Sequence, residues 1–179
     1  MIIKNGRVFQ EDGTFAEKDL YIEGKRFVSK EEVIDQEVID AKGMMVLPGL
    51  VDVHSHGAAG HDFSDGDVEG LKEILRYEKA HGITSYCPTS MTLPKDDLLK
   101  IFGTIEAIKD EPEAEVIAGV NMEGPFIDPI KKGAQAEENI VAPNAEFFRM
   151  QCGERRKNPS RNPGSEYAWF TGIYQRGFR

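Results

Sequence analysis

The sequence has little that would mark a secreted or membrane protein. It contains no run of about 18 apolar residues, so we expect no transmembrane helix and no membrane partner. Its first residues lack the apolar stretch and small-residue cleavage site of a secretory signal. It has only two cysteines, Cys87 and Cys152, far apart in the chain. We therefore expect a cytoplasmic protein whose thiols stay reduced.

Basic residues are also scarce. Lys and Arg number 22 against 31 Asp and Glu, and the net charge is −9. This argues against a nucleic-acid partner, because phosphate binding needs clustered Lys and Arg. The balance changes sign near residue 149: from Arg149 to Arg179, seven basic residues outnumber two acidic ones. Cys152–Gly164 contains no aliphatic residue and cannot supply a buried helix face.

Strand-like patterns fill the first 47 residues. A strand is predicted at 2–9 with a turn at Asn5-Gly6, and a second at 19–28 with a turn at Glu23-Gly24. Two short apolar runs follow, at 37–39 and 44–47. Together they predict a small, mostly antiparallel β module over residues 1–47.

The pattern changes at Pro48-Gly49, where buried strands begin to alternate with amphipathic helices. The expected elements are a strand at 50–53, a helix at 67–81, a strand at 83–88, a helix at 94–110 with Thr92 as its cap, and a strand at 115–121. Such alternation is typical of an α/β fold with a parallel sheet.

The strongest chemical signal is His54-x-His56, at the C-terminal end of the first of these strands. Alternate strand residues share a side, so both imidazoles can reach one metal ion. A bare pair of this kind is more often two surface histidines. However, Glu123 follows the third strand at the equivalent position, which favours a metal site at one edge of the sheet. His61 is interpreted as a solvated loop residue and His81 as structural.

Four segments resemble a known family. Pro48–Gly57 resembles the first metal-binding motif of the amidohydrolase superfamily. Gly82–Thr89, Asn121–Phe126 and Lys131–Gln135 resemble the N-acetylglucosamine-6-phosphate deacetylase family in particular, and the likeness extends to about Phe148. The resemblance implies a partial TIM-type (β/α) barrel, truncated, over residues 48–148. It also implies that residues 1–47 form a β-sandwich-like module.

The resemblance also implies a chemistry, metal-dependent hydrolysis of the acetamide of N-acetylglucosamine 6-phosphate. A divalent ion, zinc or iron, would be held by His54, His56 and Glu123, and the sugar would contact Ala134 and Gln135. Gln135 is a mild departure, since some relatives have His there. Members of the family are expected to be homo-oligomers that act on a small amino-sugar phosphate.

The larger departure is in the remaining ligands. The family's other metal ligands are histidines on later strands, and its general acid/base is a later aspartate. None of the four histidines here follows residue 81, so we expect the chain as given to be inactive and to hold no catalytic acid/base. Residues 149–179 are interpreted as an aberrant tail, frameshifted or disordered. The alternatives are an inert gene remnant, a non-catalytic fragment, or another amidohydrolase such as a dihydroorotase-like enzyme.

Overall fold

The computed structural model describes residues 1–35 and 37–147. The chain divides into two compact units, one spanning Met1–Pro48 and the other beginning at Gly49. The interpretation of residues 149–179 as an aberrant tail lies outside the described residues. None of the described helices is both long and apolar enough to cross a bilayer.

The first unit is one five-stranded sheet. Its strands are β1 (Ile2–Phe9), β2 (Phe15–Glu23), β3 (Arg26–Val28), β4 (Val38–Asp40) and β5 (Met45–Val46). The β1–β2 and β2–β3 pairs are antiparallel, whereas β4 and β5 both pair with β1 in parallel. Most of the residue pairs are antiparallel, as predicted, but the described residues form a single mixed sheet and not the sandwich-like module expected. The chain returns after β3 to pair with the other edge of β1, which accounts for the difference.

The predicted turn at Asn5-Gly6 is a bulge inside β1. The register between β1 and β2 shifts between Ile3 and Gly6, and Asn5 has a left-handed φ of 61°. The Asn5 backbone N–H donates to Asp19 Oδ1 at 3.1 Å, and its side chain donates to Asp40 Oδ1 at 2.9 Å. These hydrogen bonds stabilise the bulge in β1. The Glu23-Gly24 turn, by contrast, lies where it was predicted, between β2 and β3.

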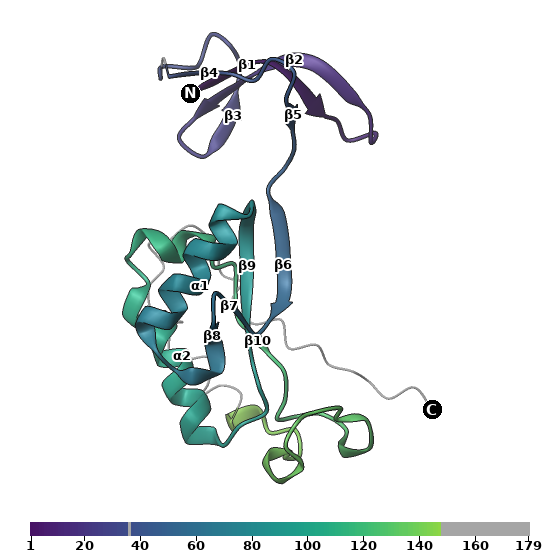
Figure 1. The fold of residues 1–179 in the computed structure, drawn as a ribbon, viewed down its shortest axis with the longest axis vertical. Helices are drawn as coiled ribbons and strands as arrows, with labels where there is room; N and C mark the ends of the chain where they lie inside the picture. The colour runs from purple at the N-terminus through teal and green to yellow at the C-terminus, as the bar shows by residue number, and fades with distance from the viewer. Residues whose placement is uncertain (36, 148–179) are drawn as a thin grey trace. The chain divides into compact units, whose positions relative to one another are not determined.

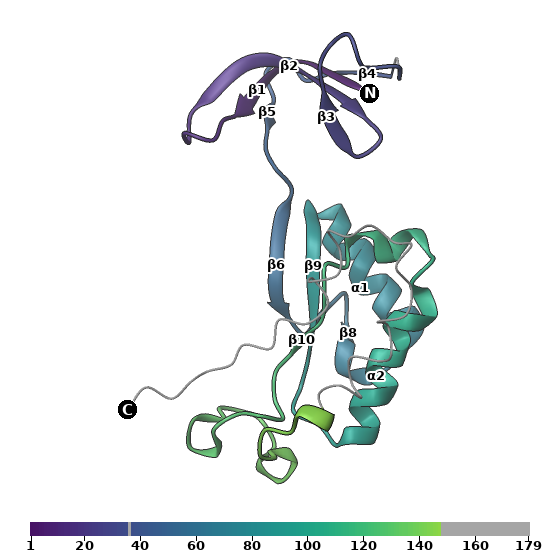
Figure 2. The same ribbon diagram turned by 180° about the vertical axis from the view of Figure 1, so that it is seen from behind.

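The second unit is a parallel sheet with its helices on one side (Figure 1; Figure 2). Its three-stranded sheet has the order β10-β9-β6, and a two-stranded ribbon, β7-β8, follows β6. The elements are β6 (Leu50–Ser55), β7 (Gly57–Ala58), β8 (His61–Asp62), η1 (Phe63–Asp65), α1 (Val68–Ala80), β9 (Ile83–Ser90), α2 (Lys95–Ile108), η2 (Pro112–Val116), β10 (Asn121–Met122), η3 (Pro129–Lys131) and η4 (Glu137–Asn139). No closed barrel forms from the described residues.

Apolar side chains at helical spacing hold the two helices on the sheet. Leu71, Ile74 and Leu75 of α1 are buried, as are Leu98 and Ile101 of α2. α1 begins where the side chain of Asp67 accepts the backbone N–H of Gly70 at 2.7 Å. The helix ends before Gly82, whose φ of 87° is left-handed.

Two local predictions were wrong. The expected strand at 115–121 is broken: its first two residues end the 3-10 helix η2, Ile117 forms an isolated parallel bridge with Tyr86 of β9, and only Asn121–Met122 forms a strand. Glu113 of η2 pairs with Arg76 of α1 at 2.7 Å, which draws the segment onto the helix. Thr92 does not cap α2: Pro94 is at the N-cap position without a side-chain bond, and the Thr92 hydroxyl bonds elsewhere.

β6 is the least covered strand of the sheet. Three of its apolar side chains are more than half exposed: Leu50 at 57%, Val51 at 64% and Val53 at 55%. Strands of parallel sheets are normally buried on both faces, and their apolar composition reflects this. β6 therefore has the sequence of an internal strand and the exposure of an edge strand.

Candidate metal centre

The carboxyl ends of the parallel strands bring three metal-ligand side chains together. His54 lies near the end of β6, His56 directly follows that strand, and Glu123 directly follows β10. Because β6, β9 and β10 run in parallel, their carboxyl ends meet at one edge of the sheet. One ligand atom from each of the three residues lies within 4.8 Å of the others.

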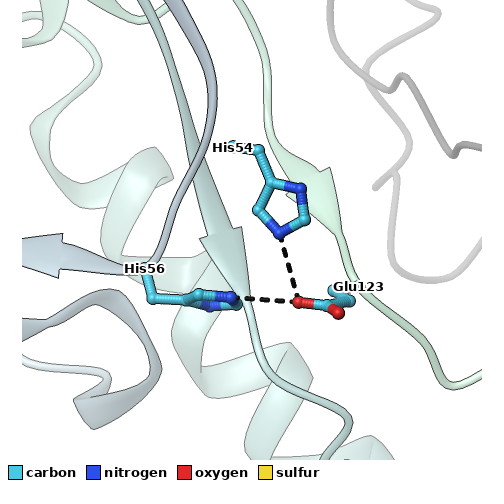
Figure 3. A group of neighbouring side chains, drawn as sticks. All are labelled: His54, His56 and Glu123. Carbon is cyan, nitrogen blue, oxygen red and sulfur yellow. Dashed lines mark hydrogen bonds and ion pairs between the residues drawn. The ribbon is translucent and has the colours of Figure 1, made fainter. Parts of the chain in front are cut away.

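Both imidazoles point at the same carboxylate oxygen (Figure 3). Glu123 Oε2 lies 3.2 Å from His54 Nε2 and 3.0 Å from His56 Nε2. The two rings meet edge to face, with centroids 5.4 Å apart. The side chains are 46%, 32% and 32% exposed for His54, His56 and Glu123, so an ion can reach them from solvent.

Backbone contacts set the orientation of His56. Its Nδ1 lies 3.1 Å from the carbonyl oxygen of Thr89, at the end of β9. A carbonyl oxygen can only accept, so Nδ1 carries the hydrogen and Nε2 keeps its lone pair in the neutral ring. Such a bond to the second nitrogen is usual for metal-binding histidines. Sequence reasoning missed Thr89, since a backbone acceptor leaves no side-chain signal.

The donor set fits a transition-metal ion. Two imidazole nitrogens and one carboxylate oxygen are ligands typical of zinc and iron, and the second nitrogen of one imidazole is already bonded. Three protein donors leave further coordination positions to water or to other groups. The residues present therefore suit the ion that the resemblance implies.

The other two histidines lie elsewhere. His61 is exposed in β8, where its ring lies against Gly70 at the start of α1. His81 follows α1; its ring packs on Tyr77 with centroids 4.1 Å apart, and its Nδ1 lies 2.7 Å from the Tyr77 carbonyl oxygen. Neither belongs to the group of three metal-ligand side chains.

The predicted sugar-contact pair is split between surface and interior. Ala134 is exposed, whereas Gln135 is only 4% exposed. The Gln135 Oε1 accepts the backbone N–H of Thr92 at 2.7 Å, and its Nε2 lies 3.7 Å from the sulfur of Met91. The Gln135 amide is thus occupied in holding its own loop against the end of β9, and its contact with a sugar stays a prediction.

Comparisons with known proteins agree with this arrangement. The profile of the amidohydrolase family matches residues 37–145, more than half of the chain. The N-acetylglucosamine-6-phosphate deacetylase of Mus musculus is 32% identical over 145 residues, which are 76% of this chain and 36% of that protein. The chain thus spans about a third of the length of this curated relative.

Two solved structures share the fold. The crystal structure of N-acetylglucosamine-6-phosphate deacetylase from Thermotoga maritima has a TM-score of 0.65 at 26% identity, covering 83% of this chain and 39% of that one. The structure of the enzyme of that name from Pasteurella multocida has a TM-score of 0.71 at 24% identity, covering 84% and 41%. The chain belongs to the amidohydrolase family. Within it, the chain is a homologue of the N-acetylglucosamine-6-phosphate deacetylases.

Proposed function

We propose that this chain carries the first half of the metal centre of a sugar-phosphate deacetylase, the class that converts N-acetylglucosamine 6-phosphate to glucosamine 6-phosphate and acetate. The observation that carries the proposal is the convergence of His54 and His56 on one oxygen of Glu123. The homology supports the substrate class and favours it over a dihydroorotase-like reaction.

Within this proposal, His54, His56 and Glu123 hold a divalent ion, zinc or iron. The bound ion would polarise the acetamide carbonyl and make a water molecule more acidic. The protein's own part is orientation: the Thr89 carbonyl fixes the His56 ring, and the backbone around Glu123 fixes the carboxylate. The segment with Ala134 and Gln135 would line the sugar.

The described residues do not complete this chemistry by themselves. Its metal group offers three protein donors, and no residue of the group is free to carry a proton between water and amine. Positioned acid/base groups contribute about 10²–10⁴-fold to such reactions. We therefore propose that activity requires further metal ligands and a proton carrier, from the part of the homologous deacetylases that this chain does not match.

A chimera tests the proposal. Residues 1–147 would replace the matched part of the Bacillus subtilis deacetylase, which is 28% identical to this chain over 155 residues. We expect the chimera to release acetate from N-acetylglucosamine 6-phosphate and to lose that activity on Glu123→Ala. The matched control is His61→Ala in the same chimera, which should stay active. A folded, metal-loaded chimera that leaves this substrate intact would refute the proposed substrate.

A further inference from the structure

Thr92 lies where three separate segments meet. It follows β9 by two residues, is 1% exposed, and uses every polar group it has. Its hydroxyl donates to the Glu123 carbonyl oxygen at 2.8 Å, and its backbone N–H donates to Gln135 Oε1 at 2.7 Å. Its carbonyl oxygen accepts the side-chain amide of Asn139 at 3.2 Å. A buried residue with all its groups bonded has little freedom to move.

The backbone of Glu123 is held on both sides by the segment that contains Thr92. The Glu123 N–H donates to the Ser90 carbonyl oxygen at 3.3 Å, and its carbonyl accepts the Thr92 hydroxyl. The neighbouring Thr89 carbonyl binds the His56 ring. One short stretch, residues 89–92, therefore contacts the residues that supply two of the three candidate ligands.

Steric fit reinforces the hydroxyl bond. A Cβ atom built on Gly124 would lie 2.0 Å from Thr92 Oγ1, far inside van der Waals contact. The hydroxyl thus fills the space beside the backbone that follows Glu123. Gly124 also has a left-handed φ of 86°, which glycine adopts without strain. The threonine and the glycine are complementary in shape as well as in hydrogen bonding.

Ser90 provides an internal contrast. It is as buried as Thr92, at 0% exposure, and lies two residues before it. Yet its Oγ has no hydrogen-bond partner among the described residues. Ser90 contributes to the position of Glu123 through its backbone alone, so its hydroxyl is dispensable for that purpose. The effect of the Thr92 hydroxyl can therefore be separated from the general effect of changing this strand end.

We propose that Thr92 is the positioning residue of the metal centre. Its hydroxyl holds the Glu123 backbone so that the carboxylate meets both histidines. Its backbone N–H and carbonyl oxygen bind the side chains of Gln135 and Asn139, which keeps the 124–139 segment beside the histidines. The inference rests on the metal-binding part of the proposed function. It adds a residue outside the group of three candidate ligands, which acts through Glu123, Gln135 and Asn139.

Two measurements on the full chain test this, using Thr92→Val, which keeps the shape and removes the hydroxyl. The first is Co²⁺ titration followed by visible absorption. The second is hydrogen exchange of the 121–140 peptides without metal. We expect Thr92→Val to weaken Co²⁺ binding about 10-fold or more and to speed exchange in 123–139. Thr92→Ser, which keeps the hydroxyl, should show the Co²⁺ affinity and the hydrogen exchange of the parent.

Matched controls separate positioning from general destabilisation. Ser90→Ala removes the unpaired hydroxyl next door, and Thr104→Val removes a buried hydroxyl that bonds only within α2, to the Ile101 carbonyl. Both variants should bind Co²⁺ with the affinity of the parent. Hydrogen exchange in 123–139 should stay as slow as in the parent. If Thr92→Val does not fold, Asn139→Ala is the substitute, because it removes one of the three contacts of Thr92. It should make hydrogen exchange in 123–139 faster than in the parent.

Three results would overturn the inference. The first is a folded Thr92→Val variant with the Co²⁺ affinity and the hydrogen exchange of the parent. The second, where Thr92→Val does not fold, is an Asn139→Ala variant with the exchange of the parent. The third is a loss of Co²⁺ affinity in Thr104→Val equal to that in Thr92→Val. If the parent chain binds no Co²⁺, the proposed metal centre fails. The exchange measurement then still decides whether Thr92 holds Glu123 and its loop.

Discussion

The Nδ1 atom of His56 lies 3.1 Å from the carbonyl oxygen of Thr89, while its Nε2 lies 3.0 Å from Glu123 Oε2. One ring nitrogen thus contacts the backbone of β9 and the other a carboxylate that follows β10. With the first nitrogen donating, the second is the lone-pair nitrogen that a metal ion requires.

Zinc binding should depend on this pair. We expect isothermal titration to give weak binding by the parent chain, because three protein donors leave positions filled by water. Glu123→Ala and His56→Ala should each abolish measurable binding. His81→Ala is the matched control, since its ring packs on Tyr77 away from the site, and it should titrate like the parent. Tight one-to-one binding that survives Glu123→Ala would place the metal elsewhere.

The chain as given should not release acetate from N-acetylglucosamine 6-phosphate above the rate of a blank. The reason is chemical: the group of three offers metal ligands but no separate proton carrier. The measurement is acetate release with zinc or iron added, using chain purified from a host lacking its own deacetylase. Turnover that disappears on Glu123→Ala would show that the chain completes the site by itself.

The sequence predicted the elements that carry the site, and it failed where a tertiary contact decides the outcome. The helix at 67–81 was predictable, because Asp67, the apolar spacing and Gly82 all indicate the same element. The strand expected at 115–121 starts later and is interrupted, because Pro112 begins a 3-10 helix that runs to Val116 and that local apolarity does not reveal.

The histidine pair and Glu123 were predictable as a group from their places after parallel strands, and the structure brings them together. The role of Thr92 was not predictable. Two residues before Pro94, it has the pattern of a helix cap, and only the fold shows Glu123 within reach of its hydroxyl. Its partners lie more than 30 residues away in sequence, where no local pattern can indicate a contact.

The core under α2 should be sensitive to truncation on one face only. Leu98→Ala removes a side chain with 0% exposure and should cost about 2–5 kcal/mol of unfolding free energy. Leu99→Ala, one residue later and 36% exposed, should cost less than about 1 kcal/mol. Urea unfolding followed by circular dichroism compares the two. Equal losses would mean that α2 does not pack as described.

The exposed valines of β6 should limit solubility. Val51 and Val53 are 64% and 55% exposed, on a strand whose composition suits a buried position. Val51→Thr with Val53→Thr keeps β-branched side chains and adds hydroxyls. We expect the double variant to stay soluble at a higher concentration than the parent, with an unchanged melting temperature. A clear loss of melting temperature would show that these valines are buried in the folded chain.

Glu78 should make the protein less stable as the pH rises. It lies on the buried face of α1 at 7% exposure, and this burial raises the pKa of its carboxyl above the ordinary 4.5; nearby Asp52 raises it further, and His81 partly opposes the shift. The folded state therefore holds the proton more tightly than the unfolded state does. The resulting stability is present below the ordinary value and is lost as the pH rises through the raised one.

Replacing this carboxyl by a neutral amide should remove the loss. We expect Glu78→Gln to melt at a higher temperature than the parent at pH 8, and the difference to shrink toward pH 4.5. A rise of about 2–4 °C corresponds to roughly 1 kcal/mol in a chain of this size. Glu138→Gln, at an exposed position, is the control and should leave the pH dependence as it is. If Glu78→Gln lowers the melting temperature at pH 8, the charged carboxylate is stabilised by a partner, and burial does not determine its effect on stability.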